Sequence, residues 1–489
     1  MTPVPALTTI GIITADRPAA VRRCLDALVR QCDVHDHRPR FLIIDGSRTP
    51  EHQTATEAIT CSIAASSGHA MAYIGAAQAT QFLARLLPDA AATSSLMPGS
   101  VGSSRNLLLL LTAGEHILTV DDDVICDTWA MRGAADSVLL MGHQQERLDT
   151  HFWPDRASVL EAIERVPVDA LTAHGALLGH SLPALIATSP RVVDLAQGCG
   201  HLRSALAEGR PLVVRVTLTG LAGDAGTYCP YRLLFSGGPL RARLWSDPEV
   251  FTTALTSRDV SRIAPARIVT HDSSCMATCM GLANSALVPP FMPVGRNEDG
   301  VFGAMLSACD RSVVFGHVPF GIIHDSDRSS WRTGTRMLSA TESRLAELIL
   351  SLVLPTSFPE ASTTPAGAIR RTGQAMMVLG EMDSGALKDL VTAVTREVRE
   401  REFNRAMQTA DDPACPDYWR TGLQEYRRAF LESSTKPGFF LPIEFHEHES
   451  VEEGFRAIGG FFRDFGRLAD SWPDLWQRAR ILNPHLRAV

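Results

Sequence analysis

A short apolar segment that runs into three consecutive carboxylates constrains this chain more than any other stretch. Residues 117–120 (Ile-Leu-Thr-Val) have the composition of a buried strand, and Asp121, Asp122 and Asp123 follow directly. Adjacent carboxylates repel one another, so a fold that places them at a strand end needs a compensating charge. Hard divalent cations such as Mg²⁺ or Mn²⁺ prefer carboxylate oxygens and often share a site with phosphates. The segment therefore predicts a metal site or, alternatively, a solvated acidic loop.

The composition is that of an ordinary globular protein without a large basic surface. The chain has 489 residues, a length that corresponds to about two to four domains. Hydrophobic residues make up 45%, charged residues make up 20%, and the net charge is −8. This charge argues against a broad contact with nucleic acid or with an anionic membrane. We therefore expect no nucleic-acid partner.

The cysteines and the apolar runs indicate in which cellular compartment the protein is expected. The ten cysteines show no zinc-type arrangement, because Cys275 and Cys279 have no second pair at matching spacing. Residues 1–7 carry neither the basic nor the apolar part of a secretion signal. The longest apolar runs, 107–111 and 345–354, fall short of the ~20 residues that span a bilayer. The sequence therefore predicts a cytoplasmic protein with reduced cysteines and no transmembrane segment.

The N-terminal residues predict a βαβ unit. Residues 8–13 form a buried strand, Pro18 suits the first turn of the helix that follows, and residues 40–44 form a second strand. This order indicates a parallel sheet, which binds ligands at the carboxyl ends of its strands. Asp45 follows the second strand at that edge, although an Asp before Gly46 is also typical of a simple turn.

The middle of the chain gives weaker signals. Its pattern predicts helices around 129–141, 159–164 and 190–208 and a strand over 211–219. Residues 220–226 are rich in glycine, and we interpret them as a turn because they lack the strand-turn-helix context of a phosphate-binding loop.

The sequence again gives clear structural signals after residue 266. A Pro-rich loop leads to Glu298 and Asp299 at the predicted start of a helix, where carboxylates also serve as simple caps. Residues 313–315 predict another strand, and His324 follows it, with His317 as the other histidine of that region.

The C-terminal part is predicted to be helical. A helix over 337–354 is followed by a Pro/Ser/Thr-rich linker over 355–365. Further helices are predicted over 369–379, 387–407, 418–431, 451–468 and 475–482.

Five short motifs then combine into one pattern. They are Thr14-x-x-Arg17-Pro18, Asp45-Gly46-Ser47, Ser104-Arg105-Asn106, Ala113-Gly114-Glu115 and Asp121-x-Asp123. In this order they resemble the N-terminal half of GT-A glycosyltransferases, in particular the family 2-like inverting members. The resemblance covers roughly residues 8–335 with a gap in the middle. It implies an α/β fold with a Rossmann-like, mainly parallel sheet.

The resemblance also implies an activity and a set of roles. The activity is transfer of a sugar from a nucleoside diphosphate sugar, with a UDP-sugar favoured, to an unidentified acceptor with the help of Mn²⁺ or Mg²⁺. The implied metal ligands are Asp123, Asp121 and His324, and the extra Asp122 leaves the register open. The implied nucleotide-side residues are Thr14, Arg17, Asp45, Arg105, Asp121 and Asp122. Asp299 is the implied general base of an inverting transfer, with Glu298 beside it. Arg328 and Trp331 are candidates for contacts with the diphosphate and the sugar.

The expected organisation is a GT-A catalytic domain over 1–335 and a helical domain or extension over 336–489. Residues 127–265 are interpreted as an insertion or an acceptor-side elaboration. Two other functions stay open. A nucleotidyltransferase would have a Gly-rich loop after the first strand, where this chain has residues 14–18 instead. A non-catalytic scaffold would use the helical tail to bind a partner. The sequence does not choose between inverting and retaining chemistry, and it leaves the oligomeric state open.

Overall fold

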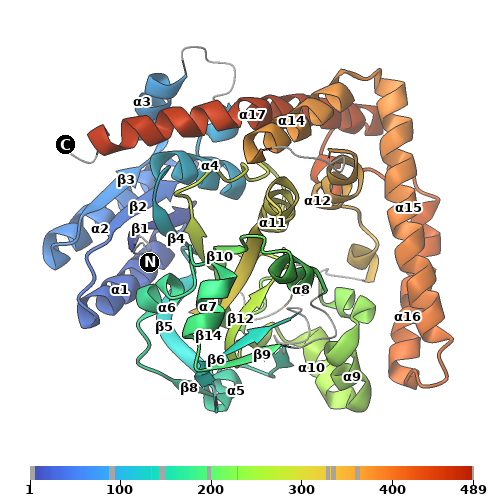
Figure 1. Ribbon diagram of the computed structural model, residues 1–489. Helices are drawn as coiled ribbons and strands as arrows, with labels where there is room; N and C mark the ends of the chain where they lie inside the picture. The colour runs from blue at the N-terminus through green and yellow to red at the C-terminus, as the bar shows by residue number, and fades with distance from the viewer. Residues whose placement is uncertain are drawn as a thin grey trace.

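The fold is α/β. The computed structural model describes residues 6–87, 94–133, 135–142, 150–194, 200–227, 229–326, 331, 337–357 and 364–486. Within these residues a mixed sheet, mostly parallel along its main path, is flanked by helices, and a helical region follows it (Figure 1). The order along the main path is β3-β2-β1-β4-β13-β10-β14-β12-β6-β9. The predicted α/β class with a helical C-terminal region is thereby confirmed.

The N-terminal part is a parallel four-stranded unit, and its first two strands with the helix between them form the predicted βαβ unit. Its strands are β1 (Leu7–Thr14), β2 (Arg40–Asp45), β3 (Met71–Ile74) and β4 (His116–Asp121). Its helices are α1 (Pro18–Val34), α2 (Pro50–Ser67), α3 (Ala76–Leu86) and α4 (Val101–Leu111). β3 pairs in parallel with β2, β2 with β1, and β1 with β4. The carboxyl ends of these strands therefore lie at one edge of the sheet.

Alternate residues of these strands enter two different cores. Ile13, Ile44 and Ile117 pack on the face covered by α4. Ile12 and Ile43 pack on the opposite face, which α1 covers. Because both faces are covered, the strands appear in the sequence as continuous apolar runs rather than as alternating ones.

Two long strands form the middle of the sheet. β10 (Val213–Asp224) and β14 (Val313–His324) run parallel to each other, and β13 (Cys279–Ala283) joins β10 to β4 by antiparallel pairing. The other strands are β5 (Val124–Met131), β6 (Ala135–Met141), β7 (His151–Phe152), β8 (Ile163–Arg165), β9 (Arg191–Asp194), β11 (Asp259–Arg262) and β12 (Ala266–Thr270). Residues 127–265 therefore contribute strands to the same sheet.

The helix predicted around 129–141 is wrong. This stretch forms β5 and β6, and burial alternates along β5 with the period of two that a strand requires. β5 pairs with both β14 and β8, so its backbone groups are satisfied by partners far away in the sequence. Tertiary pairing thus overrides the local helical pattern.

The glycine-rich turn predicted over 220–226 is also wrong for most of its length. β10 continues to Asp224 because it pairs with β14 on one side and β11 on the other. The two helices predicted over 451–468 and 475–482 are one helix, α17 (Val451–Leu486).

The remaining helices cover the sheet and form the tail. They are α5 (Arg156–Ala162), α6 (Ala170–Gly175), α7 (Leu182–Thr188), α8 (Gly200–Ala207), α9 (Gly238–Ser246), α10 (Pro248–Thr256), α11 (Glu298–Cys309), α12 (Leu345–Leu348), α13 (Leu354–Ser357), α14 (Pro365–Glu381), α15 (Ser384–Ala410) and α16 (Asp417–Ser434). Short 3₁₀ turns occur over 94–96, 230–235, 337–340 and 443–445, and a π-helical turn over 349–353 joins α12 to α13.

The helical tail shares a core with the sheet domain. Figure 1 shows α17 beside α14 along the top of the molecule and α15 beside α16 on the right. The Trp472 indole Nε1 donates to the Val288 carbonyl oxygen at 2.7 Å, and Trp476 Nε1 donates to Asn284 Oδ1 at 2.8 Å. Side chains of α14 and α17 therefore belong to the same apolar cluster as those of α4 and α11.

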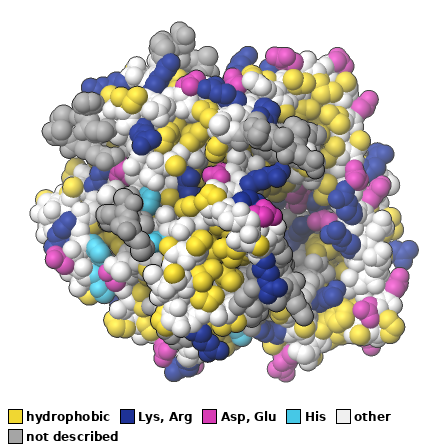
Figure 2. Space-filling model, viewed as in Figure 1, with side chains coloured by type: hydrophobic (Ala, Val, Ile, Leu, Met, Phe, Trp, Pro, Cys, Tyr) yellow, Lys and Arg dark blue, Asp and Glu magenta, His cyan; other side chains and the backbone are white. Residues whose placement is uncertain are grey.

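Two surface properties complete the description. No helix in the described part of the chain is both long and apolar enough to cross a membrane. On the face shown in Figure 2, Lys and Arg side chains are interspersed with Asp and Glu.

Candidate functional site

Three strand ends bring the predicted nucleotide-side residues to one edge of the sheet. Thr14 ends β1, Asp45 ends β2 and Asp121 ends β4. Thr14 is in register with Asp45, and Ile13 is in register with Asp121, so the three ends are direct neighbours. Such an edge is where α/β sheets bind nucleotides.

The acidic turn is joined to the end of β14. Asp122 and Asp123 form the turn between β4 and β5, and β5 pairs antiparallel with β14 so that Val124 faces His324. The backbone N–H of Asp325 donates to the Asp123 carbonyl oxygen at 2.7 Å. This pairing explains how His324 comes to lie beside Asp123, about two hundred residues away in the sequence.

Asp122 is fully buried and points back toward β1. The Thr14 hydroxyl donates to Asp122 Oδ2 at 2.6 Å, and the Arg17 guanidinium forms an ion pair with Oδ1. Burial raises the pKa of Asp122 to about 7, although Arg17 and the Thr14 hydrogen bond oppose the shift. Both carboxylate oxygens of Asp122 therefore contact residues at the end of β1 and just after it.

Asp123 makes contact with two cationic groups. Arg17 Nη1 lies 2.9 Å from Asp123 Oδ2, and His324 Nε2 lies 3.3 Å from Asp123 Oδ1. Burial disfavours its ionisation, but the contacts with His324 and Arg17 outweigh burial and hold the pKa of Asp123 below its ordinary value. Burial also disfavours a charged ring at His324, yet the contact with Asp123 raises the pKa of His324 to about 9.

Asp121 and Glu298 share one arginine. The buried Arg105 of α4 donates to Asp121 Oδ1 at 2.7 Å and to Glu298 Oε1 at the start of α11. Burial raises the pKa of Asp121 to about 6, against the charge of Arg105, and it raises the pKa of Glu298 as well. Arg105 therefore connects the end of β4 to the predicted acceptor side.

Among the described residues, two backbone N–H groups hold Asp299. Its Oδ2 accepts from the Ala277 N–H at 2.9 Å, and its Oδ1 accepts from the Gly300 N–H at 2.9 Å. The side chain is half-buried. Each oxygen keeps a second lone pair, so Asp299 is oriented and still able to accept a proton.

Asp45 has a partner that sequence reasoning missed. Its Oδ2 accepts from the Tyr73 hydroxyl at 2.9 Å, and its Oδ1 accepts from the Ser47 N–H at 2.8 Å. Tyr73 lies in β3, a strand that the sequence pattern does not predict. The four residues Met71–Ile74 give only a short apolar-aromatic signal, which is too brief to predict a strand by itself.

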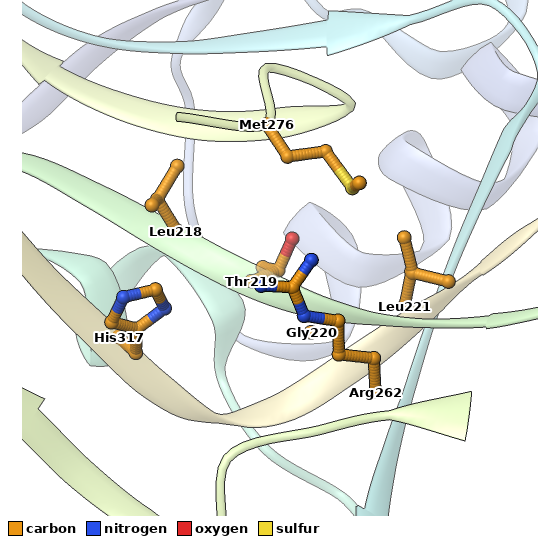
Figure 3. Close-up of a pocket in the computed structure, with 7 residues that line it drawn as sticks. All are labelled: Leu218, Thr219, Gly220, Leu221, Arg262, Met276 and His317. Atoms are coloured by element: carbon orange, nitrogen blue, oxygen red, sulfur yellow. The ribbon is translucent and has the colours of Figure 1, made fainter. Parts of the chain in front are cut away.

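His317 does not belong to the acidic edge. It lies in the middle of β14 at a small pocket, and Figure 3 shows it beside Leu218 and Thr219 of β10. Burial and the charge of Arg262 lower the pKa of His317 to about 3, so its ring is neutral. The remaining lining residues of this pocket are Gly220, Leu221, Arg262 and Met276. Of the two candidate histidines, only His324 contacts the acidic turn.

The carboxylates of the edge outnumber its cations. Among the described residues, the acids are Asp45, Asp121, Asp122, Asp123, Glu298 and Asp299, and the cations that act on them are Arg17, Arg105, His324 and, at Glu298, Arg296. A surplus of buried or half-buried negative charge is costly unless a cation compensates it. The raised pKa values of Asp121 and Asp122 are a direct consequence of this burial.

The Asp123–His324 pair fits a divalent cation. Asp123 Oδ1 is buried, and its contact with His324 Nε2 is an ion pair without hydrogen-bond geometry. Two ligands at right angles, each about 2.1 Å from a cation, lie about 3 Å apart. The 3.3 Å between Asp123 Oδ1 and His324 Nε2 is close to that spacing.

Of the three predicted metal ligands, only Asp123 and His324 contact each other in the described part of the chain. No group of three or more His, Cys, Asp or Glu side chains among them is arranged to hold a metal ion, and Asp121 is engaged by Arg105. Two protein ligands with the other positions open is the arrangement that suits a cation shared with phosphates.

Two further candidates lie beyond the acidic turn. Arg328 lies outside the described residues. The centre of the Trp331 ring lies 4.5 Å from Arg258 Cζ, so the ring stacks on an arginine that belongs to none of the sequence motifs. Sequence comparison adds no role for these residues, because neither protein-family models nor curated proteins match the chain.

Proposed function

We propose that the chain is a metal-dependent glycosyltransferase that moves a sugar from a nucleoside diphosphate sugar to an acceptor with inversion. The observation that supports this most is the buried Asp123–His324 pair, at 3.3 Å, within a carboxylate-rich edge of parallel strands. A UDP-sugar is the favoured donor, and the acceptor class stays open.

The donor side of this proposal rests on residues from the strand ends. Asp45 would accept hydrogen bonds from the ribose or the base, because its carboxylate already stands at the end of β2 with both oxygens oriented. Arg17 is half-exposed, so its guanidinium is able to contact both the acidic turn and a diphosphate. A divalent cation held by Asp123 and His324 would neutralise the charge that grows on the leaving diphosphate.

Asp299 is the better general base of the two acids at the start of α11. Glu298 is paired with Arg105, whereas among the described residues Asp299 is held by two neutral backbone N–H groups. Asp299 would take the proton of the acceptor hydroxyl as its oxygen bonds to the anomeric carbon. The bond from that carbon to the diphosphate breaks in the same step, and the nucleoside diphosphate leaves.

A donor-consumption assay tests the proposal. The purified chain is incubated with a panel of nucleoside diphosphate sugars in Mn²⁺ and, separately, in EDTA. We expect Mn²⁺-dependent release of a nucleoside diphosphate. Asp123→Asn should reduce release by about 10²–10³-fold, whereas Asp127→Asn, in the strand β5 that follows Asp123, should not.

Two results would contradict the proposal. One is that no sugar nucleotide is bound or consumed in Mn²⁺. The other is release of pyrophosphate from a sugar phosphate and a nucleoside triphosphate, which indicates a nucleotidyltransferase. Asp299→Asn separates the steps, because it should abolish transfer and leave donor affinity nearly unchanged. Normal transfer by this variant would refute the assignment of the base.

A further inference from the structure

The ring of His324 is oriented by the end of β10. Gly223 of β10 is in register with His324 of β14, and the next residue, Asp224, accepts a hydrogen bond on its carbonyl oxygen from His324 Nδ1 at 2.8 Å. A carbonyl oxygen only accepts, so Nδ1 carries the hydrogen. The lone pair of the neutral ring is therefore on Nε2, which faces Asp123.

The side chain of Asp224 is clamped by a buried arginine. Arg258 Nε donates to Asp224 Oδ2 at 2.8 Å, and Arg258 Nη2 donates to Oδ1 at 2.6 Å. The Gly226 N–H adds a hydrogen bond to Oδ1 at 2.7 Å, and the Ser326 hydroxyl contacts Oδ2. Both side chains of the ion pair are almost fully buried. A two-point contact of this kind fixes orientation as well as distance.

Arg258 is itself fixed on two sides. Its Nη1 donates to the Thr227 carbonyl oxygen at 3.1 Å, and its guanidinium lies over the Trp331 ring. The Asp224 backbone is therefore held both by the β10–β14 ladder and by a rigid side-chain contact.

The backbone around Asp224 passes too close to His324 for a side chain. Gly223 has a φ of +104°, and a Cβ there would lie 2.6 Å from the His324 carbonyl oxygen. A Cβ at Gly226, which has a φ of +68°, would lie at an ordinary contact distance of 3.6 Å from His324 Cε1. Gly223 is therefore the position that allows the end of β10 to pass this close to the histidine.

We propose that Asp224 and Arg258 are positioning residues that fix the tautomer and direction of His324, so that Nε2 is presented as the metal ligand. This inference rests on the proposed function in one respect, namely that Asp123 and His324 bind the cation. The ion pair contributes no ligand of its own, and it acts through the Asp224 carbonyl oxygen.

The test combines Mn²⁺ affinity with the tautomer of His324. Arg258→Met removes the clamp and keeps the bulk of the side chain. We expect it to weaken Mn²⁺ binding by about 10–100-fold, as loss of a partner of a metal-ligating histidine does. Arg258→Lys should recover part of this loss, because it restores the charge opposite Asp224. Arg165→Met, which breaks an exposed ion pair with Asp127, is the matched control and should bind Mn²⁺ like the wild type.

The second readout needs no metal. In nitrogen-labelled histidine spectra of the metal-free protein, the His324 signal, identified by its absence in His324→Gln, should show hydrogen on Nδ1 when the ring is neutral. In Arg258→Met both tautomers should be populated. Asp224→Asn gives a second route to the same result if Arg258→Met does not fold.

The outcomes separate the inference from the proposed function. Folded Arg258→Met and Asp224→Asn proteins with wild-type Mn²⁺ affinity and an unchanged tautomer would overturn the inference. If the wild type binds no Mn²⁺, the proposed metal site fails, and the tautomer of His324 alone then decides whether Arg258 positions the ring.

Discussion

Two clusters of arginine and acid, each built around a buried arginine, differ in their balance of charge. One is the carboxylate-rich edge of the sheet. The other lies between α15, α12 and the 3₁₀ turn over 230–235, where Arg399 and Arg232 face Glu347 and Glu402. Arg399 is fully buried, its Nη1 lies 2.8 Å from Glu402 Oε2, and Arg232 Nη2 lies 2.9 Å from Glu402 Oε1.

The difference separates a structural cluster from a candidate ligand site. In the helical cluster two guanidiniums meet two carboxylates, so the charges are matched by the protein itself. At the sheet edge the carboxylates exceed the cations, and burial raises the pKa of both Asp121 and Asp122. Matched opposite charges stabilise the contact between elements. A surplus of buried negative charge favours binding of a positively charged ligand.

The largest expected effect comes from breaking the matched cluster. Arg399→Leu should lower the free energy of unfolding by about 3–5 kcal/mol, because it leaves two buried or half-buried carboxylates with only Arg232. Urea denaturation followed by circular dichroism measures this loss.

Arg401→Leu is the control for that prediction. It lies on the same helix and removes an exposed pair with Glu397. Exposed pairs at this spacing contribute only about 0.3–0.5 kcal/mol. Equal losses for the two substitutions would show that burial and matching of charge do not distinguish the Arg399 cluster from a surface pair.

The second prediction concerns the pH dependence of the sheet edge without metal. The pKa of Asp122 is raised from 3.8 to about 7 in the folded state, so the folded protein holds a proton there that the unfolded chain loses. Its contribution to stability is therefore present below about pH 4 and is lost as the pH rises to about 7. Asp122→Asn should match the wild type near pH 4 and exceed it at pH 8, by on the order of 4 kcal/mol at most.

Asp123→Asn should behave in the opposite way. The pKa of Asp123 is lowered in the folded state, so its charged form stabilises the fold above the unfolded pKa and the benefit disappears in acid. This variant should be less stable than the wild type at pH 8 in EDTA. If both asparagine variants shift stability in the same direction at pH 8, the two carboxylates do not differ as their contacts indicate.

The sequence predicts the carboxylate-rich edge of the sheet much better than the helical cluster around Arg399. β1, β2 and β4 are covered on both faces, so each appears as an apolar run, and the Asp residues that end them mark the edge directly. The start of α11 at Glu298 was likewise predicted. Pairings between distant residues were not predicted. Arg258 contacts Asp224 because β10 pairs with β11, the strand that begins directly after Arg258. The sequence does not indicate this pairing, because the glycines of β10 are typical of a turn.

The helical cluster was beyond sequence reasoning for the same reason. The Arg/Glu pattern around residue 400 is typical of a solvated helix face, which fits the exposed pair of Arg401 and Glu397. Arg399 lies on the same stretch but is buried by packing against a segment that precedes it by about fifty residues. Local periodicity does not distinguish these two arginines, since only tertiary contact decides which face is covered.

The third prediction adds a cation to the comparison. Mn²⁺ at 100-fold above its dissociation constant should raise the free energy of unfolding by about 2.7 kcal/mol, because it binds only the folded state. Thermal denaturation with and without Mn²⁺ measures the shift. Asp123→Asn should lose the shift. Glu347→Gln should be less stable and yet keep the full shift, because its carboxylate belongs to the matched cluster. If the Mn²⁺-induced stabilisation disappears in Glu347→Gln and persists in Asp123→Asn, the cation binds at the helical cluster and not at the sheet edge.

The smallest expected effect concerns Asp45, which accepts hydrogen bonds from two neutral donors at the end of β2. Tyr73→Phe removes the hydroxyl that donates to Asp45 Oδ2 and leaves the Ser47 N–H in place. We expect a loss of stability of about 0.5–1.5 kcal/mol, the usual contribution of one hydrogen bond. The freed oxygen also loses its fixed direction, so UDP affinity measured by calorimetry should fall by a few-fold, or about 1 kcal/mol. Tyr73→Phe with unchanged UDP affinity, beside an Asp45→Ala variant that has lost it, would mean that Asp45 acts without help from β3.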